Sequence, residues 1–574
     1  DGITDYYHAF SDDWSTRPDF HAWGFGLTYK DGYFYTNTGP ALGPYNKKQA
    51  PDAGKTLKIS IADGSFQAIA HGYKAPNGIG IGYGGDIFTT DNEGTEVPTS
   101  KLMHVDIDNP EEYPFFGNSY VLGKKADGLK IKPPVVWTPQ NEIGNSPSEP
   151  GVLNVGPYKN QMIMGDARHG GLKRVFIEEV DGLLQGALFR FTQGLEAGIN
   201  RFVWGPDSSL YVGGVGGTND FTWEGKRFGL EKLTYNGKSA FEMLAVRAKS
   251  NGMEIELTES LRVGDGAAPN DYLVQQWWYD IDTEGGIKQE LENLVVKSVS
   301  ISSDKKRIFL EIDGLKPDRV VYINFIYPAL SVENKQLWSS EVWYTLNNIP
   351  SYEGVVEPTN FVRMDNNLSE EERKDGWQLL FDGESMSGWN GTSSNKSSDG
   401  WEVVEGLLSS LTAGNAILTE AVYDNFELEF QWKVEEGSDG GIFFRVPVSI
   451  PVEEIQQASP EMQIIDDQNN PDASVSQAHV TGAAYDILPP AYLIAKPAGN
   501  FNHSRIFVSD KQVQHWINGI KILDYSIGGK IWNQGFENSL YKDNSNFGSS
   551  NNGHIVVANQ KGKIWLKNIR LRSL

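Results

Sequence analysis

The sequence predicts an all-β protein built from a β-propeller, a small Ig-like β-sandwich and a C-terminal jelly roll. Three observations support this prediction: a two-strand motif recurs in the first half, short strands bounded by turn residues follow it, and the last 200 or so residues alternate polar and apolar positions. The 574 residues include 62 Gly, 27 Pro and 12% aromatic residues. This composition is typical of many short strands joined by tight turns.

A motif of two strands around a tight turn recurs along the first half of the chain. It begins at Gly24 (GFGLTYKDGYFYTN), Gly78 (GIGIGYGGDIFTTD) and Arg201 (RFVWGPDSSLYVGG), with a looser copy at Val152. Such spacing is typical of propeller blades, which are small antiparallel sheets. We therefore predict a propeller over residues 1–260, and a set of unrelated hairpins in a large sandwich is the alternative. The chain opens without an initiator Met or a signal peptide, so we expect a processed or trimmed N-terminus.

The middle of the chain is predicted to hold a spacer and a linker. Residues 261–350 carry short strands at 294–301, 307–312, 320–325 and 341–346, which is the pattern of an Ig-like sandwich. Residues 351–374 are predicted to be a linker with one short helix, in which Ser369 is the N-cap ahead of three glutamates.

Residues 375–574 are predicted to form the two-sheet jelly roll. From Phe426 to Val434, apolar or aromatic residues alternate with polar ones, so one face of this strand is expected in a core. Asn518 and Gly519 separate two further strands and predict a type I′ hairpin turn.

Composition excludes several classes of function. The 75 acidic residues exceed the 50 basic ones, and the net charge of −25 argues against a nucleic-acid partner or an anionic membrane. The chain has no cysteine, which excludes disulfides, thiolate nucleophiles, cysteine-ligated zinc and iron–sulfur clusters. It also has no apolar run long enough to be a transmembrane segment.

Seven short motifs are dispersed in order along the last domain. They are residues 376–389, Trp401 with 406–408, 440–445, 461–466, 481–485, 515–519 and 568–571. In these motifs the domain resembles the 3-keto-disaccharide hydrolase family, whose members are similar to concanavalin-type jelly rolls and are commonly exported. The resemblance implies a carbohydrate partner and an extracytoplasmic location, which would be periplasmic, on the outer surface or secreted.

Two stretches depart from the pattern of that family. Asn559 and Gln560 stand where the family usually has an Asp and a His, and Asp439-Gly440-Gly441 stands where it usually has Asn-Ser-Gly. If the replaced Asp and His are catalytic or bind a metal, this domain is altered or inactive. A non-catalytic carbohydrate-binding module on a propeller scaffold is therefore kept as an alternative.

The first half resembles the sorbosone or glucose dehydrogenase-like propellers in residues 77–80, 91–94, 165–171 and 189–194. A propeller oxidoreductase is thus a third interpretation, although no quinone-binding set can be mapped onto this chain. His169 and Asp166 are the candidate pocket residues at the propeller mouth. Asp91 and Glu93 offer hard oxygen ligands of the kind that calcium prefers, and any other cofactor stays unassigned.

The resemblance to the hydrolase family implies a specific chemistry. A ketone at C3 of a glycoside acidifies the proton on C2, because the resulting carbanion delocalises as an enolate. A base removes that proton, the C1 substituent leaves by β-elimination, and water adds to the enone to complete a net hydrolysis. The protein must supply a base, an acid for the departing oxygen, and donors or a cation for the enolate oxygen.

Glu461 is the predicted base, with Gln463 beside it as a substrate-binding residue. The two residues are two positions apart, so a strand would place both on one face while Met462 and Ile464 point into the core. A carboxylate with an amide beside it suits a base, or a metal ligand, on a sugar-facing sheet.

Further candidate residues lie in the neighbouring motifs. Asp466 would join the site if the strand ends or bulges before it. Arg445 would steady the enolate or pair with Glu461. The family resemblance adds His515 to the catalytic set, although period two predicts it to be buried and gives the sugar-stacking face to Trp516. The remaining predicted substrate-binding residues are Trp401, Tyr485, Asn502 and Asn518.

Overall fold

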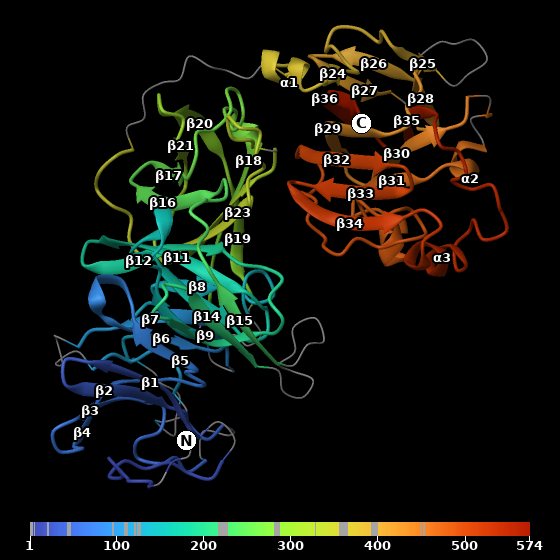
Figure 1. Ribbon diagram of the computed structural model, residues 1–574. Coiled ribbons are helices and arrows are strands. Elements are labelled where there is room, and N and C mark those ends of the chain that lie inside the picture. Colours follow the sequence, from blue (N-terminus) through green and yellow to red (C-terminus); the bar gives the residue numbers. More distant parts are fainter. Residues whose placement is uncertain are drawn as a thin grey trace. The chain divides into compact units, whose positions relative to one another are not determined.

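The structure is a computed structural model. It describes residues 4–574 except for residues 5, 20–21, 43–46, 95–96, 108–112, 120–121, 123–127, 216–227, 281–286, 328, 355–364, 392–399, 412, 449 and 452–453. The chain divides into two compact units. The first comprises residues 1–261, 273–323 and 330–359, and the second comprises 262–272, 324–329 and 360–574. Both are built from antiparallel sheets (Figure 1), which confirms the all-β class. Among the described residues, no helix has the length and apolar character needed to cross a bilayer.

Three sheets of the first unit follow the order of the chain, as the strands of a propeller blade do. The repeated motif forms the hairpins β1–β2, β5–β6 and β13–β14, as predicted. The first sheet contains β1 (Gly24–Lys30), β2 (Tyr33–Thr38), β3 (Lys55–Ser60) and β4 (Phe66–His71). The second contains β5 (Gly78–Ile81), β6 (Ile87–Asp91), β7 (Ser100–Val105) and β8 (Val136–Thr138), and the third contains β13 (Ile199–Trp204), β14 (Leu210–Val215) and β15 (Phe228–Leu233).

The glycines of the motif allow the backbones of neighbouring sheets to approach closely. A Cβ added to Gly78 would lie 2.3 Å from the carbonyl oxygen of Ser148, and one added to Gly80 would lie 2.1 Å from that of Pro150. Both carbonyls belong to β9 (Pro147–Val152), so any larger residue in β5 would force the two strands apart.

The strands predicted for the spacer belong to two sheets that also contain strands from outside residues 261–350. An eight-stranded sheet has the order β19-β18-β22-β23-β12-β11-β10-β9, and a four-stranded sheet has the order β16-β17-β21-β20. Their remaining strands are β10 (Met162–Asp166), β11 (Leu172–Val180), β12 (Leu183–Arg190), β16 (Met243–Lys249), β17 (Gly252–Leu257), β18 (Tyr272–Trp278), β19 (Gln289–Leu294), β20 (Val296–Ile301), β21 (Arg307–Ile312), β22 (Arg319–Phe325) and β23 (Glu341–Leu346).

The four strands predicted between residues 294 and 346 correspond to β20–β23. However, β17 precedes residue 261 and pairs with β21, with Met253 opposite Leu310. Likewise β12 pairs with β23, with Leu188 opposite Trp343. Such pairings join strands far apart in the chain, and no local pattern marks them.

The C-terminal domain is a two-sheet sandwich, as predicted (Figure 1). The large C-terminal sheet has the order β26-β27-β36-β29-β32-β33-β34, with β24 also paired to β36, and the five-stranded sheet has the order β25-β28-β35-β30-β31. The large sheet contains β24 (Gln378–Leu379), β26 (Trp401–Val404), β27 (Leu407–Ser410), β29 (Phe426–Val434), β32 (Asn502–Ser509), β33 (Gln512–Ile517), β34 (Ile520–Ser526) and β36 (Ile564–Ser573). The five-stranded sheet contains β25 (Trp389–Gly391), β28 (Asn415–Thr419), β30 (Asp439–Val446), β31 (Glu461–Ile465) and β35 (His554–Lys561).

The core of this domain lies between the two sheets. Phe426, Leu428 and Phe430 of β29 pack there with Ile442 and Met462 of the five-stranded sheet. The alternation predicted from Phe426 onwards is therefore confirmed. Asn518 and Gly519 both have positive φ, of 48° and 82°, as the predicted type I′ turn requires.

Short helices connect the strands of the second unit: α1 (Glu370–Lys374), α2 (Ile455–Ala458) and α3 (Lys530–Phe536). The predicted cap of α1 is confirmed, because the Ser369 hydroxyl accepts a hydrogen bond from the Glu372 backbone N–H at 3.1 Å. The Glu372 carboxylate in turn accepts one from the Ser369 N–H at 2.8 Å, which completes a capping box.

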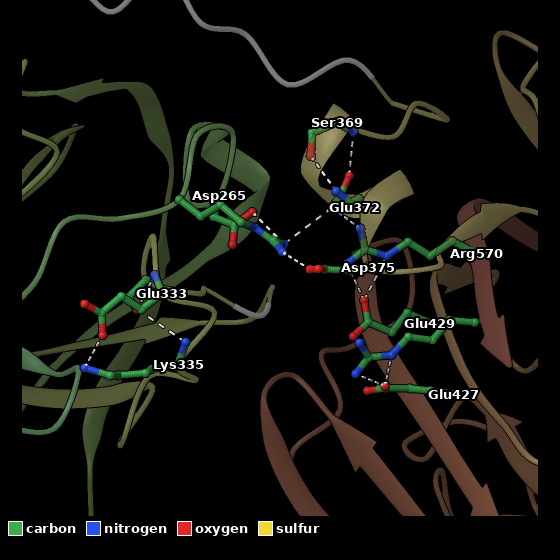
Figure 2. A network of polar contacts seen from close by, with 12 residues as sticks. Asp265, Glu333, Lys335, Ser369, Glu372, Asp375, Glu427, Glu429 and Arg570 are labelled. Atoms are coloured by element: carbon green, nitrogen blue, oxygen red, sulfur yellow. Dashed lines mark hydrogen bonds and ion pairs between the residues drawn. The ribbon is translucent and has the colours of Figure 1, made fainter. Parts of the chain in front are cut away.

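A buried ionic network covers the outer face of the large C-terminal sheet. Figure 2 shows Arg570 of β36 between Glu429 of β29 and Glu372 of α1. Arg262 lies 3.7 Å from Glu372 and 3.4 Å from Asp375. Burial alone would raise the pKa of Glu429, but the Arg570 guanidinium outweighs it and holds that pKa well below its usual range.

We expect Arg570→Met to destabilise the C-terminal domain strongly. The substitution removes the cation that contacts the buried Glu429, and breaking a buried pair in this way costs about 3–5 kcal/mol. Lys521→Met is the matched control, because Lys521 pairs with Asp524 at the surface, where such pairs contribute about 0–1 kcal/mol. Thermal melts of the two variants and the parent measure the difference. Equal melting temperatures for both variants would contradict this account of the network.

Candidate active site

Strand β31 presents polar side chains on the outside of the five-stranded sheet. Met462 and Ile464 belong to the core between the sheets, so Glu461 and Gln463 lie on the opposite face, as predicted. The neighbouring strand β30 gives this face room, because Gly441 pairs with Gln463. A Cβ added to Gly441 would lie 1.9 Å from Oε1 of Glu461, so the carboxyl group lies directly over this glycine.

The Glu461 carboxyl group is buried. The residue is 4% exposed, and neither of its oxygens is open to solvent. Burial raises the pKa of Glu461 well above its usual value, and the nearby Asp439 raises it further. The Gln560 amide acts in the opposite direction but does not reverse the shift. The environment of Glu461 therefore favours its protonated form.

Asp439 is the second carboxyl group on this face. It is half-buried, and its Oδ1 accepts a hydrogen bond from Nε2 of Gln463 at 3.2 Å. Burial, followed by the charge of Asp472, raises the pKa of Asp439 to about 6. Asp439 is therefore mostly ionised at neutral pH, whereas the environment of Glu461 favours the protonated form.

His479 lies near the two carboxyl groups and is held between two aspartates. His479 ends the short turn Gln477–His479, and its ring lies between Asp472, at 3.0 Å, and Asp486, at 2.8 Å. Burial alone would lower the pKa of His479, but its hydrogen bonds with Asp486 and Asp472 outweigh this and raise it. The Tyr485 hydroxyl donates a hydrogen bond to Asp472 at 3.1 Å, and the Tyr485 ring stacks on His479.

Three of the predicted site residues lie close together in the structure: Glu461, Gln463 and Tyr485. Asp439 and Asp472 join them, and we call Asp439, Glu461 and Asp472 the carboxyl cluster. Sequence reasoning missed Asp439, although its position two residues before Gly441 on an alternating strand already placed it on the same face. No sequence pattern pointed to Asp472 as a site residue, because its segment has the pattern of the end of a strand.

The two departures from the family pattern are neighbours in the sheet. Gly440 pairs with Asn559, and Asp439 pairs with Lys561. Asn559 is buried and its side-chain amide donates to the Gly562 carbonyl at 2.9 Å, which closes the turn after β35. The carboxylate at position 439 therefore lies beside the strand from which the usual Asp and His are missing.

Arg445 and Asp466 do not lie in this arrangement. Arg445 has φ of 54°, and its guanidinium donates to the Asp424 and Asp510 carbonyls and to the Asn425 side chain. This left-handed conformation breaks the period-two pattern that the prediction assumed. Asp466 follows β31 and accepts hydrogen bonds from the Gly437 and Gln468 backbone N–H groups. Despite burial, these bonds lower the pKa of Asp466, which organises a turn.

His515 and Trp516 lie on the other sheet. His515 is fully buried in the core, where Nδ1 contacts the Gly482 carbonyl at 2.9 Å, and burial lowers its pKa to about 4. Trp516 faces outward from the large C-terminal sheet, next to Arg505. Because Glu461 faces outward from the five-stranded sheet, the two residues lie on opposite faces of the sandwich. Trp516 therefore cannot stack on a sugar bound at Glu461.

Three other predicted substrate-binding residues are structural. Trp401 belongs to the core between the sheets. Asn502 and Asn518 are buried, and the Asn518 amide donates to the Asn502 side chain at 2.9 Å and to the Ile494 carbonyl at 3.0 Å. Their polar groups therefore bond the β33–β34 turn to Asn502 and Ile494, and they do not line the site.

Asp91 and Glu93 are used within the fold. Both oxygens of Asp91 accept backbone N–H groups, from Lys74 and Ala75, and burial raises its pKa. The Glu93 carboxylate accepts a hydrogen bond from the Ser100 hydroxyl at 3.2 Å. In the described ranges, no group of three His, Asp or Glu side chains has an arrangement that could hold a metal ion. The calcium prediction therefore gains no support from these two residues.

Asp166 and His169 form a tight turn after β10. Asp166 is fully buried and accepts hydrogen bonds from the backbone N–H groups of Asn145, Ser146, Arg168 and His169. Burial, followed by the charge of Lys173, lowers the pKa of His169 to about 3. Asp166 therefore serves the turn itself, and the role of His169 in a pocket stays a prediction.

Comparison with known proteins shows what the C-terminal domain is similar to. Residues 376–572 match the profile of a family described as the 3-keto-alpha-glucoside-1,2-lyase-like domain, which confirms the predicted resemblance. The match covers only this domain, and the first unit lies outside it.

Three known proteins are similar to parts of this chain. The chain is 27% identical over 229 residues to a 3-keto-disaccharide hydrolase of Bacteroides thetaiotaomicron, covering 35% of this chain and 79% of that protein. A solved structure from Parabacteroides distasonis, described as a candidate glycosyl hydrolase, is 27% identical and covers 37% of this chain and all of its own, with a TM-score of 0.35. A candidate oxidoreductase (glucose dehydrogenase) from Thermus thermophilus is 16% identical, covers 39% of this chain and 68% of its own, and has a TM-score of 0.30.

We expect Glu461→Gln to stabilise the protein at alkaline pH. As pH rises above the ordinary pKa of Glu, the unfolded chain releases a proton that the folded chain keeps, so the free energy of unfolding falls. Each unit of pKa difference corresponds to about 1.4 kcal/mol. The variant should therefore gain melting temperature relative to the parent between about pH 5 and pH 8, which thermal melts across this range measure. A difference between the two proteins that does not change with pH would show that Glu461 titrates normally.

Proposed function

We propose that the C-terminal domain cleaves 3-keto-glycosides by proton transfer at C2, elimination of the C1 substituent and hydration. The match of residues 376–572 to the lyase-like family supports the substrate class. One observation within the structure carries the mechanism: Glu461 and Asp439 share one face of a sheet, and burial raises the pKa of each by a different amount, that of Asp439 to about 6. Two carboxyl groups of different charge state are what acid–base catalysis at neutral pH requires.

The atoms of this reaction balance with water as the only co-reactant. A carboxylate takes the C2 proton, the C2–H electron pair forms the C1–C2 double bond, and the C1–O bond breaks. The departing oxygen takes a proton, which gives the free aglycone. Water then adds its hydroxyl to C1 and a proton to C2, which restores the 3-keto-sugar. The location of the protein outside the cytoplasm stays a prediction, supported by the resemblance to commonly exported families.

A direct test measures aglycone release from both anomers of a nitrophenyl 3-keto-glucoside. We expect the parent protein to release nitrophenol and the double variant Asp439→Asn/Glu461→Gln to be at least about 100-fold slower, the usual contribution of general acid–base groups. Glu420→Gln is the matched control, since Glu420 is exposed just after β28 of the same sheet, and it should keep the parent rate.

Failure of the parent protein to cleave either anomer would contradict the proposal. If calorimetry then showed that the protein binds the keto-glucoside, the carbohydrate-binding interpretation would replace it. Activity that survives in the double variant would show that the carboxyl cluster takes no part in the reaction.

A further inference from the structure

The two carboxyl groups of the pair differ in exposure as well as in pKa. Glu461 is 4% exposed and both of its oxygens are closed off, whereas Asp439 is half-buried. A base must come within hydrogen-bond reach of the proton that it removes. Asp439 meets this condition without rearrangement, and Glu461 does not.

The hydrogen bonds around the pair orient Asp439 in particular. The Gln463 amide donates to its Oδ1, and Gln463 itself is 1% exposed, so the carboxylate is held by a side chain that packing fixes in place. By contrast, Glu461 lies over Gly441, and both of its oxygens are buried.

The surroundings favour a single negative charge on the pair. The titratable and charged groups that face it come from several segments: Asp472, His479, Tyr485, Tyr541 and Lys561. Lys561 and His479 favour the charged form of Asp439, and Asp472 opposes it. A second negative charge on Glu461 would be buried next to the charge of Asp439, which is costly.

We propose that Asp439 is the catalytic base that takes the C2 proton, and that the neighbouring Glu461 is a positioning residue. This inference rests on the proposed function and assigns its proton-transfer step to one residue. The proton passes from C2 to an oxygen of Asp439 as the C1–O bond breaks. The departing oxygen takes its proton from water, and Asp439 then returns its proton to the solvent.

Single variants separate the two carboxyl groups. Asp439→Asn should lower kcat for release of nitrophenol from the 3-keto-glucoside at least about 100-fold. Glu461→Gln should lower kcat less than Asp439→Asn does, because an amide has the shape and the neutral charge of a protonated carboxyl group. Glu420→Gln, outside the carboxyl cluster, should keep the parent rate. Thermal melts of the variants establish that they fold.

The pH profile of kcat/KM gives a readout that a merely structural role would not change. In the parent protein the rate should rise as pH passes the pKa of Asp439, about 6, because the base must be ionised. At higher pH the rate should fall as Glu461 ionises and places a second charge beside the base. Glu461→Gln should abolish this alkaline fall and keep the acid limb.

The outcomes distinguish the inference from the proposed function. A parent protein that does not cleave the substrate overturns both. An active parent in which Asp439→Asn keeps its rate and Glu461→Gln loses it overturns the inference alone, and Glu461 is then the base. An alkaline limb that persists in Glu461→Gln also contradicts the positioning role.

Discussion

The site depends on one constraint, the burial of alternate side chains of β30 and β31 between the two sheets of the C-terminal domain. Ile442, Met462 and Ile464 pack in the core, so the residues between them must face outward. This alternation alone places three polar residues on one outer face: Asp439, Glu461 and Gln463. Gly441 then leaves the space over which Glu461 lies, and the fold brings together two carboxyl groups whose environments differ.

Local periodicity predicted this part of the site correctly. The two-residue repeat placed Glu461 and Gln463 outward, and it also predicted that His515 would be buried. It could not say to which sheet a strand belongs, and for this reason Trp516 was assigned to the wrong face of the sandwich. The prediction for Arg445 failed for another reason. Its positive φ interrupts the two-residue alternation of the strand, and no neighbouring residue type indicates this.

Local patterns also predicted the short-range features of the fold and not its long-range pairings. Hairpins with turn signals, such as those of the repeated motif and of Asn518-Gly519, appear where the sequence placed them. Long-range pairings do not follow from local patterns, so the predicted limit at residue 260 falls between β17 and its partner β21. The capping box of α1 was visible from Ser369 and Glu372, whereas the contact of Glu372 with Arg570 joins residues almost 200 positions apart and was not.

The central claim is that the carboxyl cluster moves a proton at C2 of a 3-keto-sugar, and proton NMR in deuterated water tests it most directly. The account predicts that the 3-keto-sugar released at early times carries deuterium at C2, because the original proton is lost to a carboxylate before water adds back. A product that keeps its proton at C2 while the aglycone is released would mean that the C1–O bond breaks by direct hydrolysis, and it would contradict the account.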